Sequence, residues 1–173
     1  SVEEICEENY SLSHRPGMLR LYTKKEKISD CNHCSYFGIR QKNYAFYAET
    51  GMEFEPKQEC ETAGMVLYQN HENHLRMEIR KRADENYFVV TACIHGEGRQ
   101  FFKIRMHCDR QKARIWLFRD GREMLIAEDI SLLPYTTEEA GGFVGCTIGM
   151  YASANGQDSS NYADFAWFVQ NAV

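Results

Sequence analysis

Proline is scarce in this sequence, with three residues in 173, and no segment shows the sustained apolar spacing of an amphipathic helix. There is no apolar run long enough to cross a bilayer and no leading segment that is basic and then apolar. A net charge of −5 argues against a generally basic surface for nucleic acid. We therefore expect a protein with neither a membrane nor a nucleic-acid partner.

Alternation of apolar and polar residues, which is typical of half-buried strands, dominates after residue 17. Turn residues separate the alternating segments, and Asp120-Gly121 is a strong hairpin signal. The expected strands include Tyr44–Phe54, Ala63–Tyr68, Leu75–Ile79, Tyr87–His95, Phe101–Cys108, Arg114–Arg119, Glu123–Ala127 and Tyr162–Gln170. This pattern predicts an all-β fold, an antiparallel two-sheet β-sandwich of jelly-roll type, with residues 1–173 as a single domain.

Aromatic residues are numerous, with ten Tyr, ten Phe and two Trp. Phe165 and Trp167 share an alternating face with Val169, which predicts that both rings lie in the core. Trp116 shares a face with Phe118 and is expected in the core as well. The basic run 76–82 alternates with apolar residues, so its charges are expected on the solvated face of a strand.

A glycine-rich stretch at residues 141–149 raises the possibility of a phosphate-binding loop. Glu138-Glu139 precede it and would repel phosphate, and the residues after it are poor helix formers. Phe143 follows two glycines at the tip of this loop. Its ring is either held out toward a ligand or partner, or folded back onto the edge of the sandwich, and both alternatives remain open.

The cysteine count of seven is odd, which argues against a complete set of disulfides. Cys108 shares an alternating face with Met106, and Cys146 shares one with Ile148. Together with Cys93, these cysteines are expected to be buried free thiols. This predicts a reduced protein with a cytoplasmic location.

Metal-binding patterns are incomplete. Cys31 and Cys34 have the spacing of half a zinc site, but no second pair follows, and a turn holding two thiols is favoured. His71 and His74 fit a solvated hairpin loop better than a metal site. Asp164 is the acid placed for a structural calcium ion, which is possible but not favoured because no acidic cluster lies nearby in sequence. We expect no cofactor.

Catalytic patterns are missing too. Glycoside hydrolysis needs two carboxyl groups across the sugar, and the nearest candidates, Glu49, Glu53 and Glu55, fit the solvent face of a strand. The sequence contains no G-x-S-x-G nucleophile motif. We therefore predict that the chain alone has no catalytic residues and no self-contained active site.

Five motifs in order resemble the C-terminal β-sandwich of glycoside hydrolase family 43 enzymes of the β-xylosidase and arabinofuranosidase type. They are SLSHRPGMLRLY (Ser11–Tyr22), FGIRQKNYAFYAETGMEFEP (Phe37–Pro56), ETAGMVLYQNHENHLRMEI (Glu61–Ile79), GGFVGCTIGMYAS (Gly141–Ser153) and ADFAWF (Ala163–Phe168). The resemblance implies a concanavalin-A-like jelly roll. It also implies that the catalytic carboxylates lie in a five-bladed propeller that precedes this domain in a longer enzyme.

In that family a sandwich loop lends an aromatic ring to the pocket of the propeller, which points to Phe143 here. Where the family has R-R-Q, this chain has Ile39-Arg40-Gln41, so Arg40 and Gln41 remain as expected interface or pocket residues. The resemblance implies a non-catalytic accessory domain that packs on the catalytic propeller, with a xylo-oligosaccharide or arabinoside as ligand. An independent carbohydrate-binding module and a structural interaction domain remain as alternatives.

Overall fold

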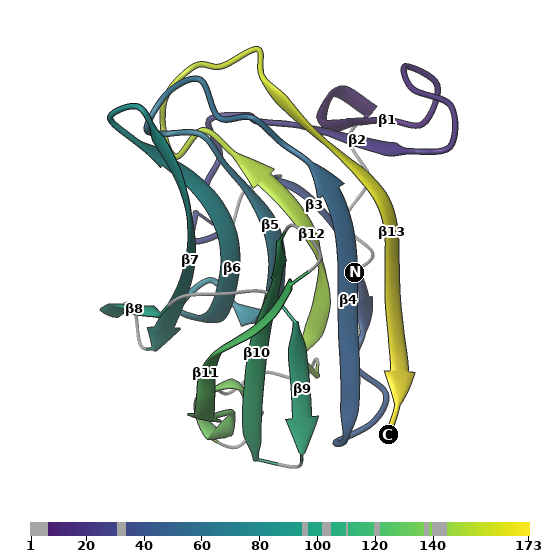
Figure 1. Cartoon of the computed structure of the whole chain (residues 1–173), viewed down its shortest axis with the longest axis vertical. Helices are drawn as coiled ribbons and strands as arrows, with labels where there is room; N and C mark the ends of the chain where they lie inside the picture. Colours follow the sequence, from purple (N-terminus) through teal and green to yellow (C-terminus); the bar gives the residue numbers. More distant parts are fainter. Residues whose placement is uncertain are drawn as a thin grey trace.

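A computed structural model describes residues 7–30, 34–94, 97–101, 105–109, 111–119, 122–136, 139 and 145–173 (Figure 1). The elements, in chain order, are η1 Glu7–Asn9, β1 Tyr10–Ser11, β2 Leu19–Tyr22, β3 Ser35–Arg40, β4 Phe46–Glu53, β5 Thr62–Asn70, β6 Asn73–Arg82, β7 Glu85–Ile94, β8 Glu97–Phe101, β9 Met106–Asp109, β10 Lys112–Arg119, β11 Arg122–Ser131, η2 Leu133–Tyr135, β12 Thr147–Ser153 and β13 Tyr162–Ala172. None of the described helices is long and apolar enough to cross a membrane.

The strands form two antiparallel sheets that pack face to face (Figure 1). One sheet has seven strands in the order β1-β2-β13-β4-β9-β10-β11, and the other has six in the order β3-β12-β5-β6-β7-β8. The last strand, β13, lies inside its sheet between β2 and β4. The predicted all-β, two-sheet sandwich is confirmed.

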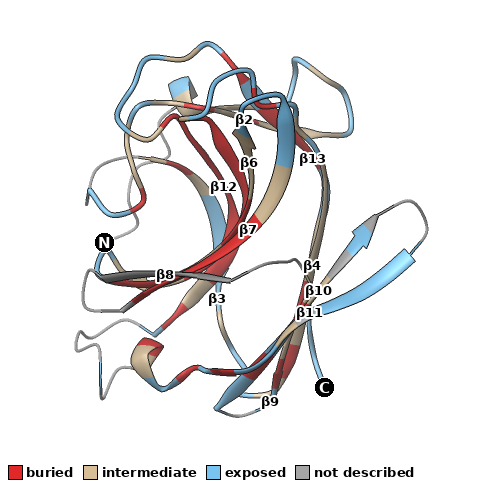
Figure 2. Ribbon diagram, turned by 60° about the vertical axis from the view of Figure 1, so that its left-hand side comes forward, coloured by how far each residue is buried: buried red, intermediate tan, exposed pale blue. Residues whose placement is uncertain are grey.

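The core lies between the two sheets, and strands of both sheets carry buried residues (Figure 2). Alternate residues of the strands point into it because successive side chains of a strand point to opposite faces. Its fully buried members include Phe46, Ala48, Met65, Leu67, Leu75, Met77, Val90, Met106, Cys108, Ala113, Ile115 and Ile148. Burying one such large apolar side chain contributes about 1.5–3 kcal/mol, so this layer dominates the stability of the fold.

The expected strand Phe101–Cys108 is divided between the two sheets. β8 ends at Phe101 and pairs with β7 in the six-stranded sheet, whereas β9 starts at Met106 and pairs with β4 and β10 in the seven-stranded sheet. The prediction of one continuous strand is wrong because the chain crosses from one sheet to the other within an alternating sequence. Alternation alone carries no signal for such a crossing.

Trp167 lies outside the core, contrary to the prediction from its alternation with Phe165. The register between β13 and β4 shifts there, with Phe165 opposite Met52 and Trp167 opposite Gly51. The extra residue is a β-bulge, which moves the following side chains to the other face. Phe165 is therefore buried, whereas Trp167 is 51% exposed and its ring lies over Gly51, where a Cβ atom would be 2.3 Å from the ring.

Trp116 and Phe118 share a face of β10, as predicted, but it is the outer face of the seven-stranded sheet. Among the described side chains of this strand, Ala113 and Ile115 are fully buried, whereas Trp116 is half-buried and Phe118 is 44% exposed. The prediction that Trp116 belongs to the core is wrong. Tyr44, which precedes β4, is also on the surface, with 83% of its area exposed.

The basic run on β6 is less solvated than predicted, because a buried carboxylate lies within it. Glu78 is fully buried, and Arg80 donates to one of its oxygens through Nε and Nη2. His74 on the same strand is buried rather than solvated, and its ring stacks on that of Tyr68 with centroids 6.2 Å apart. Burial, together with the smaller effect of the Arg76 charge, lowers the pKa of His74 to about 4, so the ring is neutral at physiological pH.

Candidate functional site

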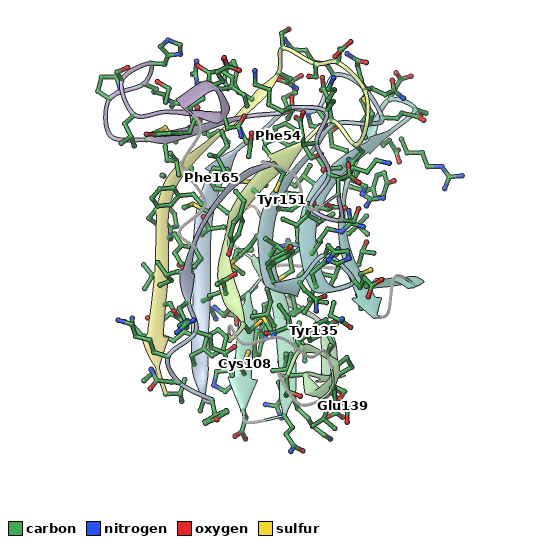
Figure 3. All side chains as sticks on the ribbon, turned by 180° about the vertical axis from the view of Figure 1, so that it is seen from behind. Phe54, Cys108, Tyr135, Glu139, Tyr151 and Phe165 are labelled. Atoms are coloured by element: carbon green, nitrogen blue, oxygen red, sulfur yellow. The ribbon has the colours of Figure 1, made fainter. Side chains whose placement is uncertain are left out.

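An open cavity of about 270 Å³ lies at one end of the sandwich, where three connections of the chain meet. The β3–β4 loop supplies its polar rim, η2 supplies part of its apolar floor, and the segment before β12 closes one side. Its lining residues are Gln41, Lys42, Asn43, Tyr44, Leu67, Leu132, Tyr135, Thr136, Gly145 and Cys146. The labelled Tyr135 marks this end in Figure 3, at the opposite end of the molecule from Phe54.

Gln41 joins two of the connections that form the cavity. Its backbone N–H donates to the carbonyl oxygen of Cys146 at 2.9 Å, and its side-chain amide donates to the carbonyl oxygen of Asn43 at 3.0 Å. Arg40, one residue earlier, pairs with Thr147 in the β3–β12 ladder and is exposed. The structure therefore brings Gln41 to the cavity, while Arg40 lies on the adjacent strand edge and does not line it.

The floor of the cavity is apolar and uncharged. Tyr135 is buried at the end of η2, its hydroxyl group has no hydrogen-bond partner among the described residues, and burial raises its pKa. Burial also raises the pKa of Cys146 to about 12, so the thiol stays protonated and is a poor nucleophile at neutral pH. The cavity is suited to holding a ring or an apolar group, and its described lining supplies no carboxylate for acid–base chemistry.

Phe143, the principal residue predicted from the sequence, lies outside the described residues, as do Gly141 and Gly142. The described chain resumes at Gly145, which is exposed and lines the cavity. A Cβ atom at Gly145 would meet nothing within 4 Å, so close packing does not explain this glycine. Phe143 is two residues from this wall in sequence, and its exposure stays a prediction.

The carboxylates considered for catalysis are engaged by arginines. Glu53 accepts hydrogen bonds from Arg15 at 2.6 and 3.1 Å, and Glu49 accepts one from Arg105 at 3.3 Å. Glu55 is exposed just after β4. Glu53 and Glu55 line an open cavity together with Asp164, but arginines hold Glu53 and Asp164 there, so no two of these three carboxyl groups are unengaged and available for the acid–base chemistry of glycoside hydrolysis.

Asp164 binds two arginines in a nearly dry position. Its carboxylate accepts from Arg20 at 2.8 and 3.0 Å and from Arg15 at 3.3 Å. Hydrogen bonding to Arg20, followed by that to Arg15, lowers the pKa of Asp164 although burial opposes this. A carboxylate neutralised by two cations is a poor calcium ligand, and the described part of the chain holds no group of three or more acidic, His or Cys residues placed for a metal ion.

Glu61 is a second buried carboxylate, and its partners are neutral. One oxygen accepts from the amide of Asn161 at 2.7 Å and from the backbone N–H groups of Lys57 and Gln58 at 2.6 and 3.2 Å, and the other accepts from the Ser159 hydroxyl group at 2.7 Å. These hydrogen bonds lower its pKa although desolvation, the largest single effect, raises it. Glu61 fastens the loop before β5 to the start of β13 and is a structural group.

Comparison with known proteins agrees with this geometry. The family model of the β-xylosidase C-terminal concanavalin A-like domain matches residues 3–170. The chain belongs to this family. It is 42% identical over 181 residues to a xylosidase/arabinosidase of Butyrivibrio fibrisolvens. The matched region covers 99% of this chain and 35% of that protein. A non-reducing end α-L-arabinofuranosidase of Bacteroides ovatus is 29% identical over 171 residues. That match covers 92% of this chain and 32% of the relative.

Solved structures of family 43 proteins have the same fold. The Bacteroides ovatus xyloglucan-locus GH43B protein superposes with a TM-score of 0.92 at 26% identity, covering 97% of this chain and 35% of that one. The xylan β-1,4-xylosidase of Bacillus halodurans superposes with a TM-score of 0.86 at 20% identity over 93% of this chain. This chain, the family's C-terminal domain, spans about a third of the length of its relatives.

The sequence did not single out Lys42, Tyr44 or Tyr135 as cavity residues. Tyr44 was assigned to a strand because it continues the alternation of β4, whereas the strand begins only at Phe46. Tyr135 lies in a single turn of 3-10 helix with Pro134 near its start, and this turn is too short to produce a periodic pattern. The sequence signals for this site were the glycine-rich loop beside it and Gln41, which the family resemblance singled out.

Proposed function

We propose that this chain is the accessory domain of a family 43 glycoside hydrolase, which packs on a catalytic propeller and narrows its pocket. The loop that carries Phe143 would reach the propeller and contribute an aromatic ring to the binding of short xylosides or arabinosides. The domain itself contributes no catalytic carboxylate. Arg40 and Gln41 would lie at the interface between the two domains.

The end cavity is the observation that carries this proposal. Its walls come from the β3–β4 loop and from Gly145, so Gln41, which the family resemblance singles out, lies in the same cavity as a residue two positions after Phe143 in sequence. The exposed ring of Tyr44 stands on the same rim. Phe37 and Ile39 on the edge strand β3 add exposed apolar surface beside Arg40, as expected where another domain packs.

A reducing, cytoplasmic location is part of the proposal. Cys60, Cys108 and Cys146 are free thiols, and Cys93, Cys108 and Cys146 are buried as predicted. Buried thiols behave as small apolar groups and need no oxidising compartment.

The test uses the full-length parent protein and compares wild type with Phe143→Ala and Phe143→Tyr. We expect Phe143→Ala to lower kcat/KM on xylobiose and on 4-nitrophenyl arabinofuranoside by about tenfold, which is about 1.4 kcal/mol of transition-state binding. Phe143→Tyr keeps the ring and should retain most of the activity. Leu12→Ala removes an exposed apolar side chain directly after β1, away from the end-cavity lining, and serves as the control.

The 173-residue chain should show no turnover of either substrate by itself. Unchanged kinetics of Phe143→Ala in the parent protein would refute the role of the loop. Turnover by the isolated chain that disappears on changing one of its carboxylates would refute the accessory role as a whole.

A further inference from the structure

The outer face of the seven-stranded sheet carries a second cavity, which shares no residue with the end cavity. It is about 420 Å³ and is lined by Tyr47, Glu49, Arg105, His107, Trp116 and Val169. These residues come from β4, β9, β10 and β13 and from Arg105 just before β9, and the strands lie side by side in the sheet (Figure 1). The volume falls within the range typical of small-ligand sites.

Strand register places these side chains in two parallel rows. The backbone N–H of Trp116 donates to the carbonyl oxygen of Arg105 at 2.5 Å, and Val169 lies opposite Glu49 on the adjacent strands. Because Ala48 is paired with Met106, Glu49 and Arg105 are also neighbours, so these four residues form one row across the sheet.

The second row lies two residues further along each strand. His107 pairs with Tyr47 on one side and with Arg114 on the other, and Asn171 lies opposite Tyr47. Strands are about 4.8 Å apart, so the distance from β10 to β4 is roughly 10 Å, which is long enough for more than one sugar ring.

Aromatic rings and hydrogen-bonding groups alternate on this face. The rings of His107 and Trp116 meet edge to face with centroids 6.3 Å apart. The guanidinium group of Arg105 lies 4.1 Å from the centroid of the Phe118 ring and 6.0 Å from that of Trp116. Tyr47 accepts a hydrogen bond from Asn171 at 2.8 Å, which fixes its hydroxyl group at the rim.

Arg105, the one arginine or lysine among the described residues that line this cavity, is paired with carboxylates of neighbouring strands. Arg105 donates to Glu49 at 3.3 Å and to Glu123 at 3.1 Å, so its charge is already compensated. A compensated guanidinium group is a weak attractor for phosphate or another anion, but its remaining N–H groups and the carboxylate lone pairs can still bind hydroxyl groups. The face is therefore polar without a net demand for a charged ligand.

Exposed large rings need an explanation in a soluble protein, and this face holds several. Trp116, Phe118 and Trp167 are all outside the core, although each would bury a large apolar area. A pyranose ring presents C–H groups to such rings and hydroxyl groups to the polar residues around them. We propose that this outer face binds a neutral pyranose oligosaccharide at a site separate from the end cavity, with Trp116 as the stacking platform and Glu49, Arg105 and His107 as hydroxyl partners.

The test begins from Trp167→Phe in the 173-residue chain, which leaves Trp116 as the single tryptophan. Titration with xylohexaose, and separately with cellohexaose, should change the Trp116 fluorescence saturably with a dissociation constant in the range of about 0.1–5 mM. Calorimetry on the wild-type chain should give the same constant. The two sugars distinguish a xylan-type ligand from a glucan-type one.

Two variants locate the binding. In calorimetry, Trp116→Ala should weaken binding at least about tenfold, and Glu49→Ala, a change at a half-exposed position, should weaken it about three- to tenfold. Tyr44→Ala removes an exposed ring from the end cavity and should leave the affinity unchanged. Thermal melts of each variant confirm that the chain is folded.

Three results would overturn the proposal. These are no saturable binding of either sugar, binding that Trp116→Ala and Glu49→Ala leave intact, or concentration-dependent dimerisation that covers Trp116. A loss of binding in Tyr44→Ala alone would assign the sugar to the end cavity instead. The kinetics of Phe143→Ala in the parent protein are a separate measurement, so this proposal and the accessory function can fail independently.

Discussion

Replacing Asp164 by Asn should destabilise the chain strongly at neutral pH. Asp164 is 2% exposed and accepts three hydrogen bonds from two arginines. The substitution leaves the guanidinium groups of Arg15 and Arg20 beside a neutral amide whose NH₂ group cannot accept their protons. Losing the charge of a buried, hydrogen-bonded pair costs about 2–4 kcal/mol, less than for a fully dry pair because Arg20 reaches solvent.

The expected loss is measurable by urea unfolding or by melting. In a chain of this size each kcal/mol lowers Tm by about 2–4 °C, so Asp164→Asn should melt roughly 5–15 °C lower than wild type at pH 7. Glu53→Gln is the matched control because Glu53 also accepts two hydrogen bonds from Arg15 but its side chain is 66% exposed. We expect little change in this control because water replaces the lost contacts.

The pH dependence of the unfolding free energy distinguishes the effect of the Asp164 charge from the effect of the side chain's shape. The pKa of Asp164 is lowered in the folded chain, so its contribution is fully present above the unfolded pKa of about 3.9 and is lost as the pH falls through the folded value. The gap in unfolding free energy between wild type and Asp164→Asn should therefore be constant above about pH 5 and narrow below about pH 4. Two results would refute this reasoning. One is a difference in unfolding free energy between wild type and Asp164→Asn that does not change with pH. The other is a difference no larger than that caused by Glu53→Gln.

Two further predictions concern the core. At pH 8 the thiols of Cys93, Cys108 and Cys146 should not react with a thiol reagent until the chain is unfolded. All three are buried, and the pKa of Cys146 is raised to about 12. Rapid reaction in the native state would contradict their placement. Phe165→Ala should lower the free energy of unfolding by about 3–5 kcal/mol, as measured by urea unfolding. Trp167→Ala should lower it clearly less, since about half of this residue is exposed to solvent. Equal decreases for the two variants would contradict the bulge.

Most of the strand pattern could be predicted because each sheet has one face buried in the core. Phe46 and Ala48 on β4, and Met106 and Cys108 on β9, are buried where alternation places them. The prediction fails at Trp167, where one inserted residue reverses the faces of β13. A bulge has no reliable sequence signal, and a large aromatic residue such as Trp167, two positions after Phe165, suggests a core position.

The candidate site was predicted less completely because its contacts are distant in sequence. Gln41 and Cys146, which both line the end cavity and are joined by a backbone hydrogen bond, are 105 residues apart, and only the fold brings them together. The outer-face cavity was missed because Trp116 was assigned to the core from the face that it shares with Phe118. Which of the two faces of a strand is covered depends on the sheet packing, and the period of the sequence does not determine it.

The position of β13 bears on how the chain is made. Because β13 lies between β2 and β4, the seven-stranded sheet has a gap at its centre until the residues from Tyr162 onward leave the ribosome. At about 5–20 residues per second, β2 and β4 wait several seconds with unpaired edges, which are templates for pairing with other chains. A chain truncated before Tyr162 would keep those edges permanently and should accumulate as aggregate or be degraded.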